Sequence, residues 1–226
     1  MDDRDGPAAR PADLRTVPDV AAAALETFLE VRPRTILLSG GSTPKRLYES
    51  LARVDEYPWD EVEAFFGDER CVPPDDERSN AQMAGEALLD GVPARSYPID
   101  GAACDADGYE RILHERFGSA PAFDLALYGL GPDGHTGSLF PGRPEVDVRD
   151  RWVVWVPEAG LAPFVPRVSL TLPALSAADV GLLLVAGEEK REALRRLLDG
   201  NPIPAAGLRP QRLVILADRA AVHGIG

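Results

Sequence analysis

The segment TILLSGGSTPKRLYESLARV (Thr35–Val54) passes from an apolar run through a glycine-rich turn into a pattern with helical period. Its first five residues, Thr35–Ser39, are nearly continuously apolar, as in a strand that is buried on both faces. For the helix we expect Thr43 as the N-cap and Pro44 as the first helical residue. A strand, a tight loop and a helix in this order are typical of an α/β fold.

The same alternation of strands and helices continues along the chain. Further strands are expected at 62–68, 123–130, 152–156, 167–172, 180–185 and 212–217. Further helices are expected at 21–31, 80–90, 105–118 and 188–198, the second of them capped by Ser79. This order predicts a mainly parallel sheet covered on both faces, in one domain spanning residues 17–226. Residues 1–16, rich in Asp, Arg, Pro and Ala, are expected to form a poorly ordered lead-in.

Composition excludes several classes of protein. Acidic residues outnumber basic ones, 37 against 24, which gives a formal net charge of −13. Because nucleic-acid-binding domains usually carry a basic stripe, we expect no nucleic-acid partner. No apolar run reaches the roughly 18–20 residues of a membrane helix, and the first residues lack a signal-peptide pattern. We therefore expect a soluble, cytoplasmic protein with no membrane partner.

Cysteines and histidines are few and scattered. Cys71 and Cys104 lie far apart and form no C-x-x-C motif, so we expect no disulfide framework. We also expect Cys71 to be inert, because nothing near it in sequence supplies a general base. The three histidines, His114, His135 and His223, show no metal-ligand spacing, and we expect no metal site.

The carboxyl ends of the strands are where a parallel sheet binds ligands. After the first strong strand, Gly40 and Gly41 allow unusual torsions and close approach, while Ser42 and Thr43 add hydroxyl groups. The first turn of the helix exposes N–H groups, so this turn can hold a phosphate. On this segment alone an ordinary capped loop is an equally good interpretation. The spacing of a Walker loop is absent.

The loop after the strand at 123–130 reads GLGPDGHTGSLFPG (Gly129–Gly142). Its G-x-G-x-x-G spacing matches a dinucleotide fingerprint, but the prolines within and after it argue against the long helix which that motif opens. The same loop places Asp133 two residues before His135. An imidazole can exchange a proton near neutral pH, and a carboxylate can orient its ring. A lone histidine is more often structural, but a position at a strand end among glycines favours a functional role for His135.

Charged residues at other strand ends have ordinary explanations as well. Asp68 ends the strand at 62–68 and Arg70 follows it, and the commoner fate of such a charge run is a solvated turn. Arg167 and Lys190 are single cations that would normally lie on the surface. An acidic protein that binds an anion nevertheless needs a few well-placed cations, although composition does not say which.

Five blocks of the sequence, taken in order, resemble the 6-phosphogluconolactonase family, which is related to glucosamine-6-phosphate isomerases and deaminases. The blocks are LSGGSTPKRLYESLA, FFGDERCVPPDDERSN, LALYGLGPDGHTGSLFPG, RVSLTLPAL and GEEKREALRRLL. The resemblance implies a Rossmann-like three-layer α/β sandwich with a mainly parallel sheet. It also implies hydrolysis of 6-phosphogluconolactone, the second step of the oxidative pentose phosphate pathway, without metal or cofactor. The only partner implied is the small sugar-phosphate lactone.

The resemblance also suggests roles for individual residues. Gly40, Gly41, Ser42 and Thr43 match the phosphate-contacting loop of the family, and Arg167 and Lys190 match the cations that complete it. His135 matches the base, with Asp133 as its support. Asp68 and Arg70 would line the sugar-ring side, and loop amides near Gly131 or the Arg70 guanidinium are candidate donors to the oxyanion.

Two departures and three alternatives remain. Gly137 stands where the family commonly has Ala, which could loosen the loop, and the N-terminal strand (ADLRTV) is short. The first alternative is an isomerase or deaminase on the same scaffold, but Phe140 stands where those enzymes carry a proton-transferring glutamate. The second is a dinucleotide-dependent oxidoreductase. The third is a sugar-phosphate sensor domain, for which the sequence before the first strong strand offers no basic helix-turn-helix.

Overall fold

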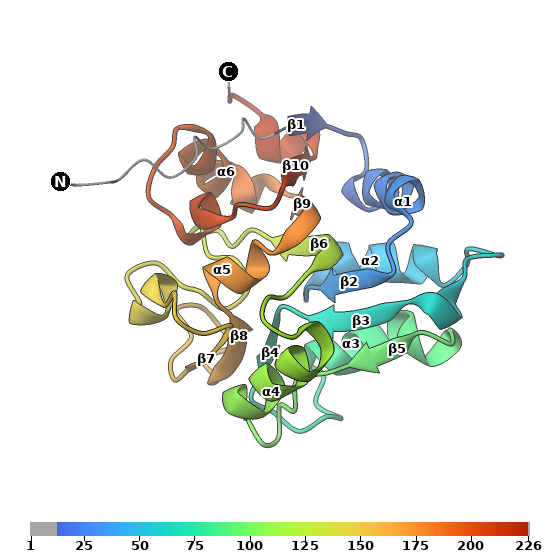
Figure 1. Ribbon diagram of the computed structural model, residues 1–226. Coiled ribbons are helices and arrows are strands. Elements are labelled where there is room, and N and C mark those ends of the chain that lie inside the picture. Colours follow the sequence, from blue (N-terminus) through green and yellow to red (C-terminus); the bar gives the residue numbers. More distant parts are fainter. Residues whose placement is uncertain (1–12, 226) are drawn as a thin grey trace.

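The computed structural model describes residues 13–225 and contains a seven-stranded parallel sheet flanked by helices (Figure 1). Across the sheet the strands run β1 (Asp13–Thr16), β10 (Arg212–Ala217), β9 (Ala178–Val185), β6 (Phe123–Gly129), β2 (Thr35–Leu38), β3 (Glu63–Phe66) and β5 (Arg95–Tyr97). In Figure 1 this order descends from β1 at the top to β5 at the lower right. The predicted α/β fold with a mainly parallel sheet is confirmed.

Seven α-helices are found in residues 13–225. They are α1 (Val20–Val31), α2 (Ser42–Leu51), α3 (Asn80–Ala87), α4 (Ala106–Phe117), α5 (Leu172–Leu175), α6 (Arg191–Leu198) and α7 (Arg219–Val222). Side chains cap four of them by accepting first-turn N–H groups, namely Asp19, Ser79, Asp105 and Asp218. The cap predicted at Ser79 is confirmed. Helices α1 and α2 pack against each other, and α2 also packs against α3.

The core is built from the strands that the sequence marked as continuously apolar. Leu182–Val185 of β9 and Leu125–Tyr128 of β6 are buried. A single hydrophobic cluster joins these strands to the inner faces of the helices and extends from Val20 to Ala221. Burial of this apolar surface is the main force that holds the sheet and helices together.

A second sheet was not predicted as a separate unit. It is antiparallel, in the order β4 (Asp68–Arg70), β8 (Arg167–Leu170) and β7 (Val153–Val156), and it lies at the lower left of Figure 1. The predicted strand at 62–68 therefore divides into β3 and β4. Gly67 makes the division, because its N–H donates to Leu38 of the large sheet while its carbonyl accepts from Leu170 of the small one.

The strand order reverses beside β2. The chain builds outward from β2 to β3 and β5, then returns to place β6 on the other side of β2. The loops that leave β2 and β6 therefore start side by side at the carboxyl edge. Such a reversal opens a crevice between the two loops, which is the usual place for a ligand in this kind of sheet.

The structure corrects two local predictions. Residues 13–16, which we assigned to a poorly ordered lead-in, form β1, because the edge of β10 offers them a complete parallel partner. The rest of that lead-in, residues 1–12, lies outside the described residues. Helix α2 begins two residues early, at Ser42, and its N-cap is Gly41 instead of Thr43.

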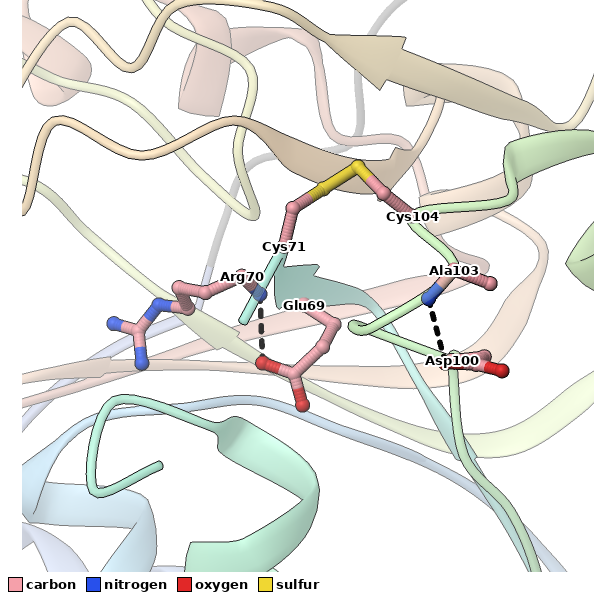
Figure 2. The surroundings of a disulfide bond; sticks show 6 residues. All are labelled: Glu69, Arg70, Cys71, Asp100, Ala103 and Cys104. Atoms are coloured by element: carbon pink, nitrogen blue, oxygen red, sulfur yellow. Dashed lines mark hydrogen bonds between the residues drawn. A yellow bond between two sulfur atoms is a disulfide. The ribbon is translucent and has the colours of Figure 1, made fainter. Parts of the chain in front are cut away.

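The expectation that the cysteines stay unpaired is wrong. Cys71 and Cys104 form a disulfide across 33 positions of sequence, with their Cα atoms 5.0 Å apart (Figure 2). The loop before α4 lies against the end of β4: a Cβ added to Gly101 would stand 2.5 Å from the Arg70 carbonyl oxygen. This contact between distant segments brings the two sulfurs together, and no motif spacing announces it.

Two searches of residues 13–225 were negative. None of their helices has the length and apolar character needed to cross a membrane. Nor do three or more His, Cys, Asp or Glu side chains gather there in a way that could hold a metal ion.

Candidate active site

A cavity of about 300 Å³ opens where the loops after β2, β6 and β9 meet the small sheet. Ten of the eleven residues predicted for the site line it: Gly40, Gly41, Ser42, Thr43, Asp68, Arg70, Gly131, His135, Arg167 and Lys190. The eleventh, Asp133, stands behind His135 and contacts its ring. The fold thus gathers residues from five segments of the chain around one cavity.

The N-terminus of α2 forms one wall of the cavity. Gly41 adopts a φ of +107°, a torsion that only glycine adopts readily, and lets the chain turn from β2 into the helix. No side chain of residues 13–225 caps α2. Because the first-turn N–H groups of an α-helix have no acceptor within the helix, those of Ser42 and Thr43 remain available to an anion.

His135 and Asp133 form a hydrogen-bonded pair. The Nδ1 atom of His135 lies 2.6 Å from Asp133 Oδ1, and the His135 backbone N–H donates to the same oxygen at 3.1 Å. Burial raises the pKa of Asp133, but the hydrogen bonds and charge of His135 outweigh it and hold the pKa below its ordinary value. An ionised carboxylate can only accept, so Nδ1 carries a proton, and in the neutral ring the lone pair is then on Nε2.

The glycines of this loop make room for the imidazole. A Cβ on Gly131 would stand 2.0 Å from His135 Nδ1 and 2.6 Å from Asp133 Oδ1. The Gly131 N–H also donates to the His135 carbonyl at 2.8 Å, which closes the loop. On its other side the ring packs on Phe140 with centroids 4.7 Å apart. The imidazole is therefore held by a carboxylate, a glycine and an aromatic ring.

Ser138 anchors the same loop to the small sheet. Its hydroxyl donates to Asp68 at 2.6 Å, and its N–H donates to Ser169 Oγ at 3.1 Å. The neighbouring Gly137 has a φ of +54°, and a Cβ there would stand 3.1 Å from Ser169 Oγ. Glycine at 137 thus relieves a tight contact while Ser138 holds the loop in place.

Arg167 is a buried cation. It is 4% exposed, its guanidinium lies 5.5 Å from the centre of the Phe140 ring, and it donates to the carbonyl of Pro163. No carboxylate of residues 13–225 lies within 4.0 Å of it, and its Nε has no hydrogen-bond partner there. Burial lowers the pKa of Arg167, although Asp68 partly opposes this. An unpaired buried charge is costly, so this side chain is placed to receive an anion.

Arg70 stands opposite Arg167 in the ladder of β4 and β8. Its Nη1 donates to the backbone carbonyl of Arg78 at 2.6 Å and to the side chain of Asn80 at 2.7 Å. Lys190 reaches the cavity from the carboxyl side of β9, beside Glu189. Three cations and the N-terminus of a helix therefore surround one cavity of a strongly acidic protein.

Sequence reasoning missed two residues of this site. Asn80 lines the cavity and is 2% exposed, and Glu69 is 1% exposed and accepts hydrogen bonds from the first turn of α3. Ser79 was recognised as a helix cap, but no local pattern shows that the next residue turns into a ligand cavity. The partners of both residues are defined only when β4 and α3 come together.

Comparison with known proteins gives a consistent result. Residues 14–217 match the family described as "Glucosamine-6-phosphate isomerases/6-phosphogluconolactonase". The chain is 42% identical over 203 residues to a 6-phosphogluconolactonase of Synechocystis sp., covering 83% of this chain and 82% of that one. It is 40% identical over 220 residues to a 6-phosphogluconolactonase of Nostoc sp., covering 90% of each. The solved structure of 6-phosphogluconolactonase from Trypanosoma cruzi matches with a TM-score of 0.87 at 29% identity, covering 96% and 98% of the two chains.

Proposed function

The chain belongs to the glucosamine-6-phosphate isomerase/6-phosphogluconolactonase family, and on that premise we propose that it hydrolyses 6-phosphogluconolactone to 6-phosphogluconate. The reaction is the second step of the oxidative pentose phosphate pathway. The observation that carries the proposal is the cavity itself: a supported imidazole and three cations without carboxylate partners within 4.0 Å, among the described residues, line the same 300 Å³ space.

His135 is the general base in this proposal. Its Nδ1–H donates to Asp133, so Nε2 accepts a proton from the water that attacks C1 of the lactone. The same proton then passes to the ring oxygen as the C1–O bond breaks. Asp133 keeps the useful tautomer and stabilises the imidazolium that forms. Acid–base help of this kind contributes about 10²–10⁴-fold to the rate.

The phosphate binds at the opposite end of the substrate. Gly40, Gly41, Ser42 and Thr43 offer backbone N–H and hydroxyl groups, and Arg167 and Lys190 supply charge. A phosphate does not react in the hydrolysis, so its binding energy serves to hold C1 in register with the imidazole. Asp68 and Arg70 stand on the sugar-ring side, where Arg70 and the backbone at Gly131 donate to the developing oxyanion.

Deamination of glucosamine 6-phosphate is the second candidate, because the same family includes isomerases. The residue at the position of the deaminase glutamate is Phe140, which is 1% exposed and packs on His135. A phenyl ring cannot transfer a proton. This observation favours lactone hydrolysis over ring opening and loss of ammonia.

A lactonase assay on the purified protein, corrected for spontaneous hydrolysis, tests the proposal. We expect rapid turnover of 6-phosphogluconolactone, no ammonia from glucosamine 6-phosphate, and no tight binding of NADPH in calorimetry. Ammonia release without lactone hydrolysis would refute the proposed function and favour deamination. We also propose a cytoplasmic location. Because disulfides are uncommon in the cytoplasm, the Cys71–Cys104 disulfide makes this location worth testing.

A further inference from the structure

Asn80 has no role in the mechanism above, yet it lies between two residues that do. It is the first residue of α3, is 2% exposed, and lines the cavity. We infer that Asn80 is a positioning residue for the proposed lactonase reaction: its amide holds the Arg70 guanidinium toward the substrate and keeps it apart from the Asp68 carboxylate. This inference rests on the proposed function.

The amide of Asn80 satisfies opposite charges at its two ends. Its Oδ1 accepts from Arg70 Nη1 at 2.7 Å. Its Nδ2 donates to the backbone carbonyl of Asp68 at 2.9 Å and approaches the Asp68 carboxylate at 3.5 Å. A primary amide is the side-chain group that carries an acceptor and a two-proton donor on one plane. A side chain without this pair of groups would remove a hydrogen bond from Arg70, from Asp68 or from both.

Keeping Arg70 and Asp68 apart preserves the charge that a substrate needs. Opposite charges in a partly buried site attract strongly and would otherwise pair directly. Within residues 13–225 no carboxylate stands within 4.0 Å of the Arg70 guanidinium, whose Nη1 is held by two neutral oxygens. Arg167, its cross-strand partner, repels it. Neutral acceptors therefore have to fix Arg70 in place, and Asn80 supplies one of them.

Glu69 and Gly40 fix the position of Asn80. Glu69 Oε1 accepts from the backbone N–H groups of Arg70 at 2.6 Å and of Asn80 at 2.8 Å, which ties β4 to the start of α3. Burial raises the pKa of Glu69, and these hydrogen bonds oppose the shift. Gly40 lies against the amide itself, where a Cβ on Gly40 would stand 2.0 Å from Asn80 Oδ1. Glycine at 40 is thus required by the amide itself, and the amide has little freedom to turn.

A double-mutant cycle between Asn80→Ala and Arg70→Ala tests this inference. The readouts are kcat/KM for 6-phosphogluconolactone and the Kd of 6-phosphogluconate, whose carboxylate carbon is the former C1. We expect Asn80→Ala to lower kcat/KM and to raise the Kd, each by about tenfold or more, because it removes a hydrogen bond to a charged group. In the Arg70→Ala background the same change should cost less than about twofold. Equal losses in both backgrounds would overturn the inference, as would wild-type values for Asn80→Ala.

Two further variants separate positioning from general disruption. Gln82→Ala is the control, because Gln82 lies two residues along the same helix and its side chain hydrogen-bonds to Glu86, outside the cavity lining. It should keep wild-type kinetics. Asn80→Asp retains an acceptor for Arg70, but its carboxylate neutralises the charge of the guanidinium. We therefore expect this variant to raise the Kd of 6-phosphogluconate about as much as Asn80→Ala does. An unchanged Kd would contradict the proposed separation of charges.

The binding half of the cycle distinguishes this inference from the proposed function. A wild-type protein that binds 6-phosphogluconate without hydrolysing the lactone would refute the lactonase proposal, while the Kd cycle would still measure the coupling of Asn80 to Arg70. A wild-type protein that neither binds nor hydrolyses these compounds would refute both.

Discussion

At the scale of single residues, Asp133 and His135 show how a short loop can build a hydrogen-bonded carboxylate–imidazole pair. They lie two positions apart in sequence, and Gly131 leaves the space in which the ring reaches the carboxylate. The sequence could predict this pair because both members belong to one loop. It could not predict Asn80 or Glu69, because the hydrogen bonds that join β4 to α3 link residues ten or more positions apart.

Replacing Asp133 with Asn should lower kcat without unfolding the protein. The amide can donate a proton to Nδ1, which would favour the tautomer with its proton on Nε2 and remove the base. We expect a fall of about 10²–10⁴-fold in kcat, with little change in the Kd of 6-phosphogluconate. Steady-state kinetics and calorimetry measure the two effects. An unchanged kcat would exclude the orienting role of Asp133.

The lowered pKa of Asp133 also predicts that the stability of the protein depends on pH. Because the pKa of Asp133 in the folded protein lies below the ordinary value of 3.8, its ionised form stabilises the fold. This contribution is present above the unfolded pKa and is lost as the pH falls through the folded pKa. The gap in unfolding free energy between wild type and Asp133→Asn should therefore shrink between pH 6 and about pH 3. Urea titrations at the two pH values measure it, and a constant gap would contradict the assignment.

At the scale of elements, the chain divides where the sequence suggested continuity. The run at 62–68 has a single apolar pattern, yet Gly67 passes it from the large sheet to the small one. That division turns Asp68 and Arg70 toward the cavity and pairs β4 with β8, so that Arg70 faces Arg167. Local periodicity predicts that a strand exists, but the choice of neighbour depends on segments about a hundred positions away.

The disulfide ties β4 to the loop before α4, close to the cavity. Figure 2 shows that Arg70, the neighbour of Cys71, extends its side chain away from the sulfur atoms. The bond should therefore stabilise the fold without touching the substrate. Closing a loop across 33 positions is worth about 2–4 kcal/mol in the unfolding free energy.

Urea unfolding with and without a dithiol reductant measures this contribution. The unfolding free energy of the wild type should fall by about 2–4 kcal/mol on reduction. The double variant Cys71→Ser/Cys104→Ser should have the stability of the reduced wild type, and the reductant should not change it. Identical stability of wild type in both conditions would show that the bond contributes nothing.

At the scale of the whole molecule, positive side chains gather at the cavity although the net charge of the protein is negative. The chain carries a formal charge of −13, while Arg70, Arg167 and Lys190 converge on the cavity. The α/β fold and the cavity at the strand ends followed from the sequence, because parallel sheets place their loops there. Which of the 24 basic residues reach the cavity did not follow, because it depends on the packing of both sheets.

Selectivity for the phosphate tests this distribution. Lys190→Ala should lower the ratio of kcat/KM for phosphorylated over unphosphorylated lactone by about tenfold or more, because a charged hydrogen-bond donor is lost. Arg191→Ala is the matched control: it removes the adjacent cation, which contacts Glu188 and Ala220 and does not line the cavity. A ratio that stays at the wild-type value in Lys190→Ala would refute the phosphate assignment.

Both ends of the cavity are tested together by comparing turnover with binding in His135→Ala. If His135 activates water while separate groups hold the phosphate, kcat for 6-phosphogluconolactone falls by about 10²–10⁴-fold and the Kd of 6-phosphogluconate stays within about threefold of wild type. Turnover at the wild-type rate in His135→Ala would contradict the proposed mechanism.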